Sequence, residues 1–227
     1  MDCTPNIERI FFLLLLCLLL FFMLKLIAIS WPTFFKDEAE VINALFESGL
    51  PLLHLRKPNA DVGDVEKLIK HISPEFHDRL TMHYFPQLAA DYELGGYHFS
   101  KGFDEAPDDD WEGRLSASCH SIDEANARVG ELDYVFLSPI FDSISKEGYK
   151  SAFAPDLLWQ ANNEGRINRR MIALGGVTPE NMSLVQDYGF GGAAVLGGLW
   201  KGLSRDEIMN NYWRFLNWQD AISEVVV

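Results

Sequence analysis

Basic residues are scarce in this sequence. Its 227 residues include 19 lysines and arginines against 33 aspartates and glutamates, which gives a formal net charge of −14 at pH 7. Proteins that bind nucleic acid or anionic membrane surfaces gather basic residues into patches. The charge balance therefore argues against a nucleic-acid partner and makes adsorption on a membrane unfavourable. Acidic residues crowd the stretch 104–112, a pattern typical of a solvated loop.

Cysteine is also scarce, with only Cys3, Cys17 and Cys119. Three scattered cysteines exclude a disulfide framework and a zinc finger. Nothing in this usage requires an oxidising compartment, so we predict a cytoplasmic protein. No low-complexity linker divides the chain, and 48% hydrophobic residues suffice for one full core. The oligomeric state is left open, and a homo-oligomer is compatible with the sequence.

The hydrophobic run Ile10–Leu24 lacks the features of a targeting segment. No positively charged region precedes it, and its 15 residues fall short of the about 20 that a spanning helix needs. Its end is also needed for the first strand of the fold, which we place at 24–30. We therefore predict a hydrophobic extension at 1–22, explained by a mis-assigned start before Met23 or by an added segment, and a single domain at 23–227. A membrane anchor is the less favoured alternative.

From Met23 onward, short apolar runs alternate with amphipathic stretches. The amphipathic stretches predict helices that include 37–47, 61–72, 123–129, 179–188 and 205–216. The apolar runs predict buried parallel strands at 24–30, 51–56, 79–84, 96–100, 114–119, 133–138, 170–175 and 192–196.

Eight strands at about 25 residues per strand–helix unit predict a (β/α)₈ TIM barrel near its lower size limit. A doubly wound open sheet shows the same alternation and is the competing architecture. The number of strands and the position of the glycines favour the barrel.

Paired glycines end the last two predicted strands, as Gly175-Gly176 and Gly197-Gly198. In (β/α)₈ enzymes, the loops after strands seven and eight frequently hold a phosphate. Glycine lets backbone N–H groups approach a phosphate closely, although glycine pairs also serve simple tight turns. Because both pairs follow late strands, we predict a phosphate site at the carboxyl end of the barrel.

The loop after the sixth strand is the second candidate for anion binding. It carries two hydroxyls and an ammonium at Ser143, Ser145 and Lys146. Such groups are good donors to phosphate, and an ordinary polar loop has the same composition.

Several segments together resemble the thiamine phosphate synthase and thiazole tautomerase family. Each segment alone is weak, but their order and spacing are specific, and they cover the presumed barrel and none of residues 1–22. The resemblance implies a (β/α)₈ fold, a phosphorylated thiazole as the small-molecule partner, and a role in making thiamine. The matching segments are Leu53–Arg56, Gly96–Phe99, Ser116–Ser121, Asp133–Phe141, Ser143–Lys146 and Ala173–Val177.

The resemblance also implies binding residues. For thiazole phosphate these are Ser143, Ser145, Gly175, Gly176, Leu196 and Gly197. The residues that match the pyrimidine pyrophosphate site are Arg56, Ser118 and Lys146. At other positions of that site, His54 and His83 replace a glutamine and an asparagine, and Pro58 replaces a lysine, with Lys57 one place early.

The largest departure from the synthase pattern concerns Mg²⁺. Tyr84 and Phe103 stand where the pattern has aspartates, and Asp104 recovers one of them only by a one-residue shift. Release of pyrophosphate needs charge neutralisation, which Mg²⁺ held by carboxylates supplies. We therefore predict no cofactor, with Mg²⁺ at Asp104 only if the chain is a synthase.

Histidines at neighbouring strand ends suggest another chemistry. An imidazole with an ordinary pKa near ~6.5 suits proton transfer at neutral pH. The tautomerase branch needs no metal and is similar to this chain at His54 and His120. We predict a tautomerase with His120 as general acid/base and with His54 and Arg56 on the substrate carboxylate.

Three alternatives stay open. They are an active synthase, a non-catalytic binder of thiazole or thiamine phosphates, and Zn²⁺ bound by three of the four histidines His54, His83, His98 and His120. Each histidine is also compatible with a purely structural role.

Overall fold

We analysed a computed structural model of the chain, which describes residues 24–100, 105–142 and 151–218. The predicted extension 1–22 lies outside the described residues. So do four predicted site residues, namely Asp104, Ser143, Ser145 and Lys146.

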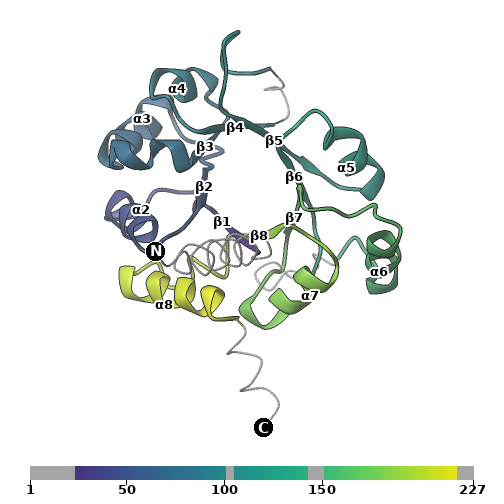
Figure 1. The fold of residues 1–227 in the computed structure, drawn as a ribbon. Coiled ribbons are helices and arrows are strands. Elements are labelled where there is room, and N and C mark those ends of the chain that lie inside the picture. Colours follow the sequence, from purple (N-terminus) through teal and green to yellow (C-terminus); the bar gives the residue numbers. More distant parts are fainter. Residues whose placement is uncertain (1–23, 101–104, 143–150, 219–227) are drawn as a thin grey trace, which may run out of the picture.

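Eight parallel strands close into a barrel in chain order, with β8 paired to β1. Figure 1 shows the strands as a central ring with the helices outside it. The (β/α)₈ fold is therefore confirmed, and each predicted strand agrees with the observed one to within a residue at either end. The strands are β1 (Lys25–Ile29), β2 (Leu52–Leu55), β3 (Leu80–His83), β4 (Gly96–Phe99), β5 (Arg114–Cys119), β6 (Tyr134–Leu137), β7 (Met171–Leu174) and β8 (Gly192–Val195).

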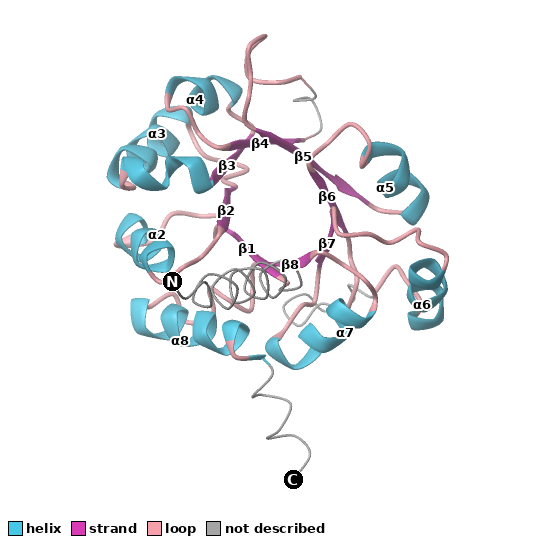
Figure 2. Cartoon of the chain, in the orientation of Figure 1, coloured by secondary structure: helices cyan, strands magenta, loops and turns pink. Residues whose placement is uncertain are grey.

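The helices form a layer outside the strand ring, and among the described residues only loops lie outside it where β4 connects to β5 (Figure 2). The predicted helix at 179–188 begins as a 3₁₀ turn, because Thr178 and Asn181 form a reciprocal capping box there. No described helix combines the length and the apolar character that crossing a membrane requires. The helices are α2 (Glu38–Glu47), α3 (Val62–His71), α4 (Pro86–Asp91), α5 (Ile122–Arg128), α6 (Pro155–Asn163), α7 (Met182–Asp187) and α8 (Arg205–Leu216), with 3₁₀ turns η1 (Pro74–Arg79) and η2 (Pro179–Asn181).

Side chains that alternate along each strand build two separate cores. Leu53 and Leu55 of β2 face outward into the large core beneath the helices, so His54 between them faces into the barrel. Part of the interior is apolar and contains Ile27, Ile29, Tyr134, Phe136, Ile172 and Ala194. The rest of it is polar and buried, and contains His54, Thr81, His83, His98 and Ser116.

Candidate active site at the mouth of the barrel

The glycine pair after β7 has a backbone conformation that glycine adopts more readily than other residues. Gly175 and Gly176 adopt φ angles of +97° and +64°, which strain any residue with a Cβ. Within the described residues, the N–H groups of Gly176, Gly197 and Gly198 donate to no protein acceptor. These amides are therefore available to an anion.

Both glycine loops line one cavity of about 790 Å³. Trp31 and Trp200 contribute apolar walls, while Lys201 and the ion-paired residues Glu180 and Arg214 contribute charge. A volume of this order accommodates a small organic ligand. The arrangement suits a compact, flat molecule that carries a phosphate.

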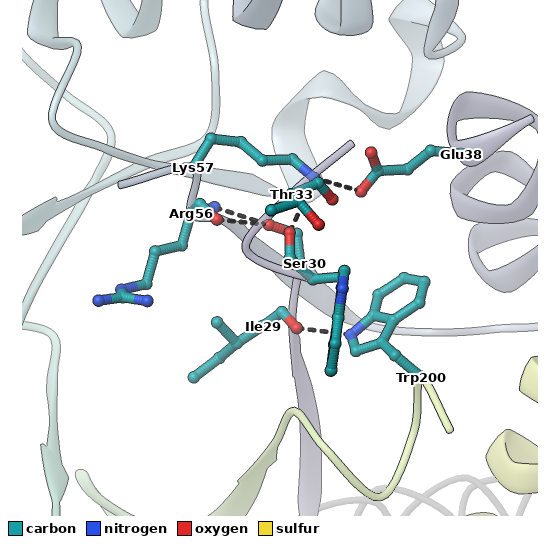
Figure 3. A network of polar contacts seen from close by, with 8 residues as sticks. Ile29, Ser30, Thr33, Glu38, Arg56, Lys57 and Trp200 are labelled. Atoms are coloured by element: carbon teal, nitrogen blue, oxygen red, sulfur yellow. Dashed lines mark hydrogen bonds and ion pairs between the residues drawn. The ribbon is translucent and has the colours of Figure 1, made fainter. Parts of the chain in front are cut away.

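A buried ion pair stands beside this cavity (Figure 3). Lys57 Nζ donates to Glu38 Oε1 at 2.6 Å and to the carbonyl oxygens of Trp31 at 2.8 Å and Thr33 at 3.0 Å. The Lys57 and Glu38 side chains are only 0% and 2% exposed, and burial raises the pKa of Glu38 above its ordinary value despite the lysine. The three hydrogen bonds of the Lys57 ammonium therefore hold the loop after β1 in place. Although Lys57 lies only one residue before the lysine position of the synthase pattern, its ammonium is not free to bind a pyrophosphate.

Further hydrogen bonds in Figure 3 fasten the ends of β1, β2 and β8 to one another. Trp200 Nε1 donates to the carbonyl of Ile29 at 2.6 Å. Ser30 Oγ donates to the carbonyl of Arg56 at 3.1 Å and accepts from the Arg56 N–H at 2.8 Å. The walls around the cavity are thus held in place by hydrogen bonds within the protein.

The Arg56 side chain points away from this network in Figure 3. Its guanidinium carbon lies 5.9 Å from the centre of the Tyr84 ring, a weak cation–π contact. No carboxylate among the described residues forms an ion pair with Arg56. The guanidinium can therefore receive an anionic ligand, as predicted for the substrate carboxylate.

Three histidines meet inside the barrel below Arg56. His54 Nδ1 lies 2.9 Å from His83 Nε2, and His54 Nε2 lies 2.6 Å from the Tyr134 hydroxyl. His98 stacks on His83 with ring centres 4.3 Å apart and bonds the hydroxyls of Ser116 and Ser118. Burial lowers the pKa of all three imidazoles, to about 3 for His98, so the cluster is neutral near pH 7.

This packing bears on three predicted site residues. His54 is 0% exposed and His83 is 4% exposed, and the Ser118 hydroxyl is bonded to His98. Their direct contact with substrate stays a prediction, and the geometry favours an indirect role for His54, because both of its ring nitrogens already have partners.

His120 lies just beyond the end of β5 and is exposed. Its Nδ1 is 3.1 Å from the carbonyl oxygen of Ser138, and its backbone N–H donates to Glu124 Oε2 at 2.7 Å. Because a carbonyl only accepts, Nδ1 carries a hydrogen in this contact, and the neutral form of the ring then has its lone pair on Nε2. His120 is therefore held in the tautomer that a general base needs.

The described residues do not fit Mg²⁺. At the end of β3, the imidazole of His83 and the ring of Tyr84 stand where the synthase pattern has an asparagine and an aspartate, and Mg²⁺ prefers oxygen ligands. The one group of three or more ligand-type side chains in the described part of the chain is the histidine cluster.

Sequence reasoning missed the contributions of two tryptophans, one tyrosine and one buried ion pair to the site. Trp31 and Trp200, each just beyond a strand end, could have been read as pocket walls. Tyr134 was hidden in an apolar strand, although the period of two places it on the inner face with Phe136. The Lys57–Glu38 ion pair gave no signal, because nothing local marks two distant charges as partners.

Comparison with known proteins gives consistent matches. Residues 25–199 match the family model described as thiamine monophosphate synthase. The thiamine-phosphate synthase of Geobacillus kaustophilus is 25% identical over 174 residues, which cover 72% of this chain and 78% of the relative. A shorter match, 36% identical over 100 residues, links the chain to the thiamine-phosphate synthase of Nitrosococcus oceani and covers 40% of this chain and 41% of the relative.

Solved structures agree with the sequence matches. The crystal structure of thiamine phosphate pyrophosphorylase from Bacteroides thetaiotaomicron superposes with a TM-score of 0.77 at 34% identity, covering 87% of this chain and 98% of that one. The thiamine phosphate pyrophosphorylase of Pyrococcus furiosus, at 17% identity and a TM-score of 0.68 over 88% of this chain and 96% of that one, supports the fold alone.

Proposed function

The chain belongs to the thiamine monophosphate synthase family, and from this premise we propose that it is a thiazole tautomerase: an isomerase that binds a phosphorylated thiazole carboxylate and transfers a proton on it. The phosphate lies on the free amides of Gly176 and Gly197, and Arg56 pairs with the carboxylate. His120 is the acid/base group. The observation that carries the proposal is the 3.1 Å contact of His120 Nδ1 with the Ser138 carbonyl oxygen, which assigns the hydrogen of the neutral imidazole to Nδ1 in an exposed residue.

A single histidine can both remove and return the proton in this reaction. Nε2 of His120 takes a proton from one carbon of the non-aromatic heterocycle, and the electron pair moves through the ring system. The resulting imidazolium then returns the proton to a second carbon, which completes the aromatic ring. The Ser138 carbonyl stabilises the imidazolium throughout, since Nδ1–H points at its oxygen. No metal takes part in these steps, in keeping with the imidazole and phenol groups at the end of β3.

Aromatisation of the thiazole carboxylate phosphate, followed by absorbance, tests this proposal. His120→Gln keeps a hydrogen-bonding side chain but lacks the base, and we expect its kcat to fall by about 10²–10⁴-fold with little change in KM. His77→Gln is the matched control, because His77 precedes β3 at the opposite end of the barrel and bonds the Tyr92 carbonyl. Full activity in His120→Gln would refute the role of this histidine.

A divergent synthase is the second candidate, and the names of the relatives favour it. Its signature is release of pyrophosphate when the pyrimidine pyrophosphate and thiazole phosphate are supplied together with millimolar Mg²⁺. We expect none from this chain. Metal-dependent release at a rate above that of aromatisation would replace the tautomerase by the synthase, whereas calorimetric binding of thiazole phosphate without either turnover would identify a binding protein.

A further inference from the structure

We propose that His54, His83 and His98 form a binding site for a late first-row divalent cation such as Zn²⁺, inside the barrel. The proposal is independent of the tautomerase reaction. One ring nitrogen from each histidine lies within 4.8 Å of the other two, and all three side chains are buried. They come from the adjacent strands β2, β3 and β4, so the barrel itself fixes their spacing.

The distances suit an ion of this size. Zn–N bonds of about 2.0–2.1 Å in a tetrahedral site place neighbouring nitrogens about 3.3 Å apart. His54 Nδ1 and His83 Nε2 already face each other at 2.9 Å, and the third nitrogen lies within 4.8 Å of the other two. The three nitrogens are therefore close enough for one ion, which would bind with reorientation of the stacked rings of His83 and His98.

The surroundings supply the second layer that histidine ligands need. The Tyr134 hydroxyl lies 2.6 Å from His54 Nε2, and the Ser116 and Ser118 hydroxyls bond the two nitrogens of His98. When an ion takes Nδ1 of His54, the ring proton resides on Nε2 and is donated to the Tyr134 oxygen. One serine oxygen accepts the remaining N–H of His98 in the same way. Such outer partners orient the rings and raise their basicity.

The donor set also selects the class of metal. Imidazole suits Zn²⁺, Co²⁺, Ni²⁺ and Cu²⁺, whereas Mg²⁺ and Ca²⁺ require oxygen ligands that this cluster lacks. Three protein ligands leave a fourth position for water or a small anion.

Metal content of the full chain tests the proposal directly. The purified protein is stripped with a chelator and dialysed against a small excess of Co²⁺, and bound metal and visible absorption are measured. We expect one Co²⁺ per chain, with the intense bands of a four-coordinate ion, and its displacement by one equivalent of Zn²⁺. Absence of stoichiometric binding, or the weak bands of a six-coordinate ion, would overturn the site and identify the cluster as a hydrogen-bonded core.

Variants separate this site from adventitious binding. His98→Asn and His83→Gln should each abolish stoichiometric binding, and Tyr134→Phe should weaken it about 10–100-fold, the usual loss for an outer partner. His71→Gln, which removes an exposed histidine on α3, should leave binding unchanged.

Folding is checked by thermal unfolding without metal. Zn²⁺ should raise the Tm of the wild-type protein and of His71→Gln but not that of folded His98→Asn or His83→Gln. Equal binding in all variants would contradict the proposal, and none of these readouts depends on activity.

Discussion

The interior of the barrel has two halves of different chemistry. On the side of β1, β6, β7 and β8, residues such as Ile27, Phe136 and Ile172 pack into an apolar cluster. On the side of β2 to β5, the buried side chains are polar and are linked by hydrogen bonds centred on His54. Tyr134 belongs to both, since its ring packs in the apolar cluster and its hydroxyl bonds His54.

The same division continues at the mouth. Beyond β7 and β8, the groups that we propose for ligand binding are backbone amides of glycine loops, whereas beyond β1 and β2 the chain is held by the Lys57–Glu38 ion pair. A backbone site survives any substitution that spares its glycines. A site made of side chains changes its chemistry with one or two substitutions, as His83 and Tyr84 illustrate. In our proposal, the glycine half therefore retains the phosphate site, while the histidine half lacks, among its described residues, the carboxylates that Mg²⁺ would need.

The largest effect should come from breaking the ion pair. Lys57→Met leaves the Glu38 carboxylate buried without a partner, which typically costs about 3–5 kcal/mol of unfolding free energy. The double variant Lys57→Met, Glu38→Leu removes both charges and should recover most of that loss. Urea unfolding of the two variants measures the difference. If the single variant were as stable as the double variant, the Lys57–Glu38 ion pair would not be what holds the chain beyond β1 and β2.

Tyr134→Phe tests the connection between the two halves. It keeps the ring in the apolar cluster and removes the only hydroxyl bonded to His54 Nε2 within the described residues. An unsatisfied buried nitrogen costs about 1–3 kcal/mol. Tyr92→Phe is the matched control, because its hydroxyl bonds the exposed carboxylate of Glu66 and should cost under about 1 kcal/mol. Equal losses in metal-free protein would mean that the histidine network adds nothing to stability.

The two halves of the barrel also differ in how much of their structure the sequence predicts. Strands alternate with helices at a regular spacing, so all eight strands were placed, and the glycine pairs mark their own site because the backbone requirement is local. The burial of His54 and its bond to Tyr134 depend on strands that meet only across the closed barrel. The Lys57–Glu38 pair likewise depends on side-chain packing between the loop after β2 and the start of α2. Local patterns contain no information on such contacts.

Gly176→Ala tests the glycine loops beyond β7 and β8. At φ +64° an alanine costs about 1–2 kcal/mol, and its Cβ would clash with the backbone of Phe141 and Asp142. Because this clash would displace the Gly176 N–H from the phosphate, we expect thiazole phosphate affinity, measured by calorimetry, to fall more than tenfold, a loss of about 1.4 kcal/mol or more. Gly130→Ala, whose Cβ would meet open space, should change neither affinity nor stability. Unchanged affinity in Gly176→Ala would show that the phosphate does not bind at this loop.

The smallest effect should come from the rim of the cavity. Arg214 and Glu180 form an exposed ion pair at 2.7 Å, and such pairs contribute only about 0.2–1 kcal/mol. Arg214→Ala should therefore leave stability nearly unchanged and weaken binding of thiazole phosphate by less than about fivefold, an effect that disappears in high salt. Lys67→Ala removes the same kind of surface pair on α3 and should not affect binding. A loss larger than that of Gly176→Ala would mean that a side chain, and not the glycine backbone, supplies most of the phosphate affinity, which would erase the contrast between the two halves of the mouth.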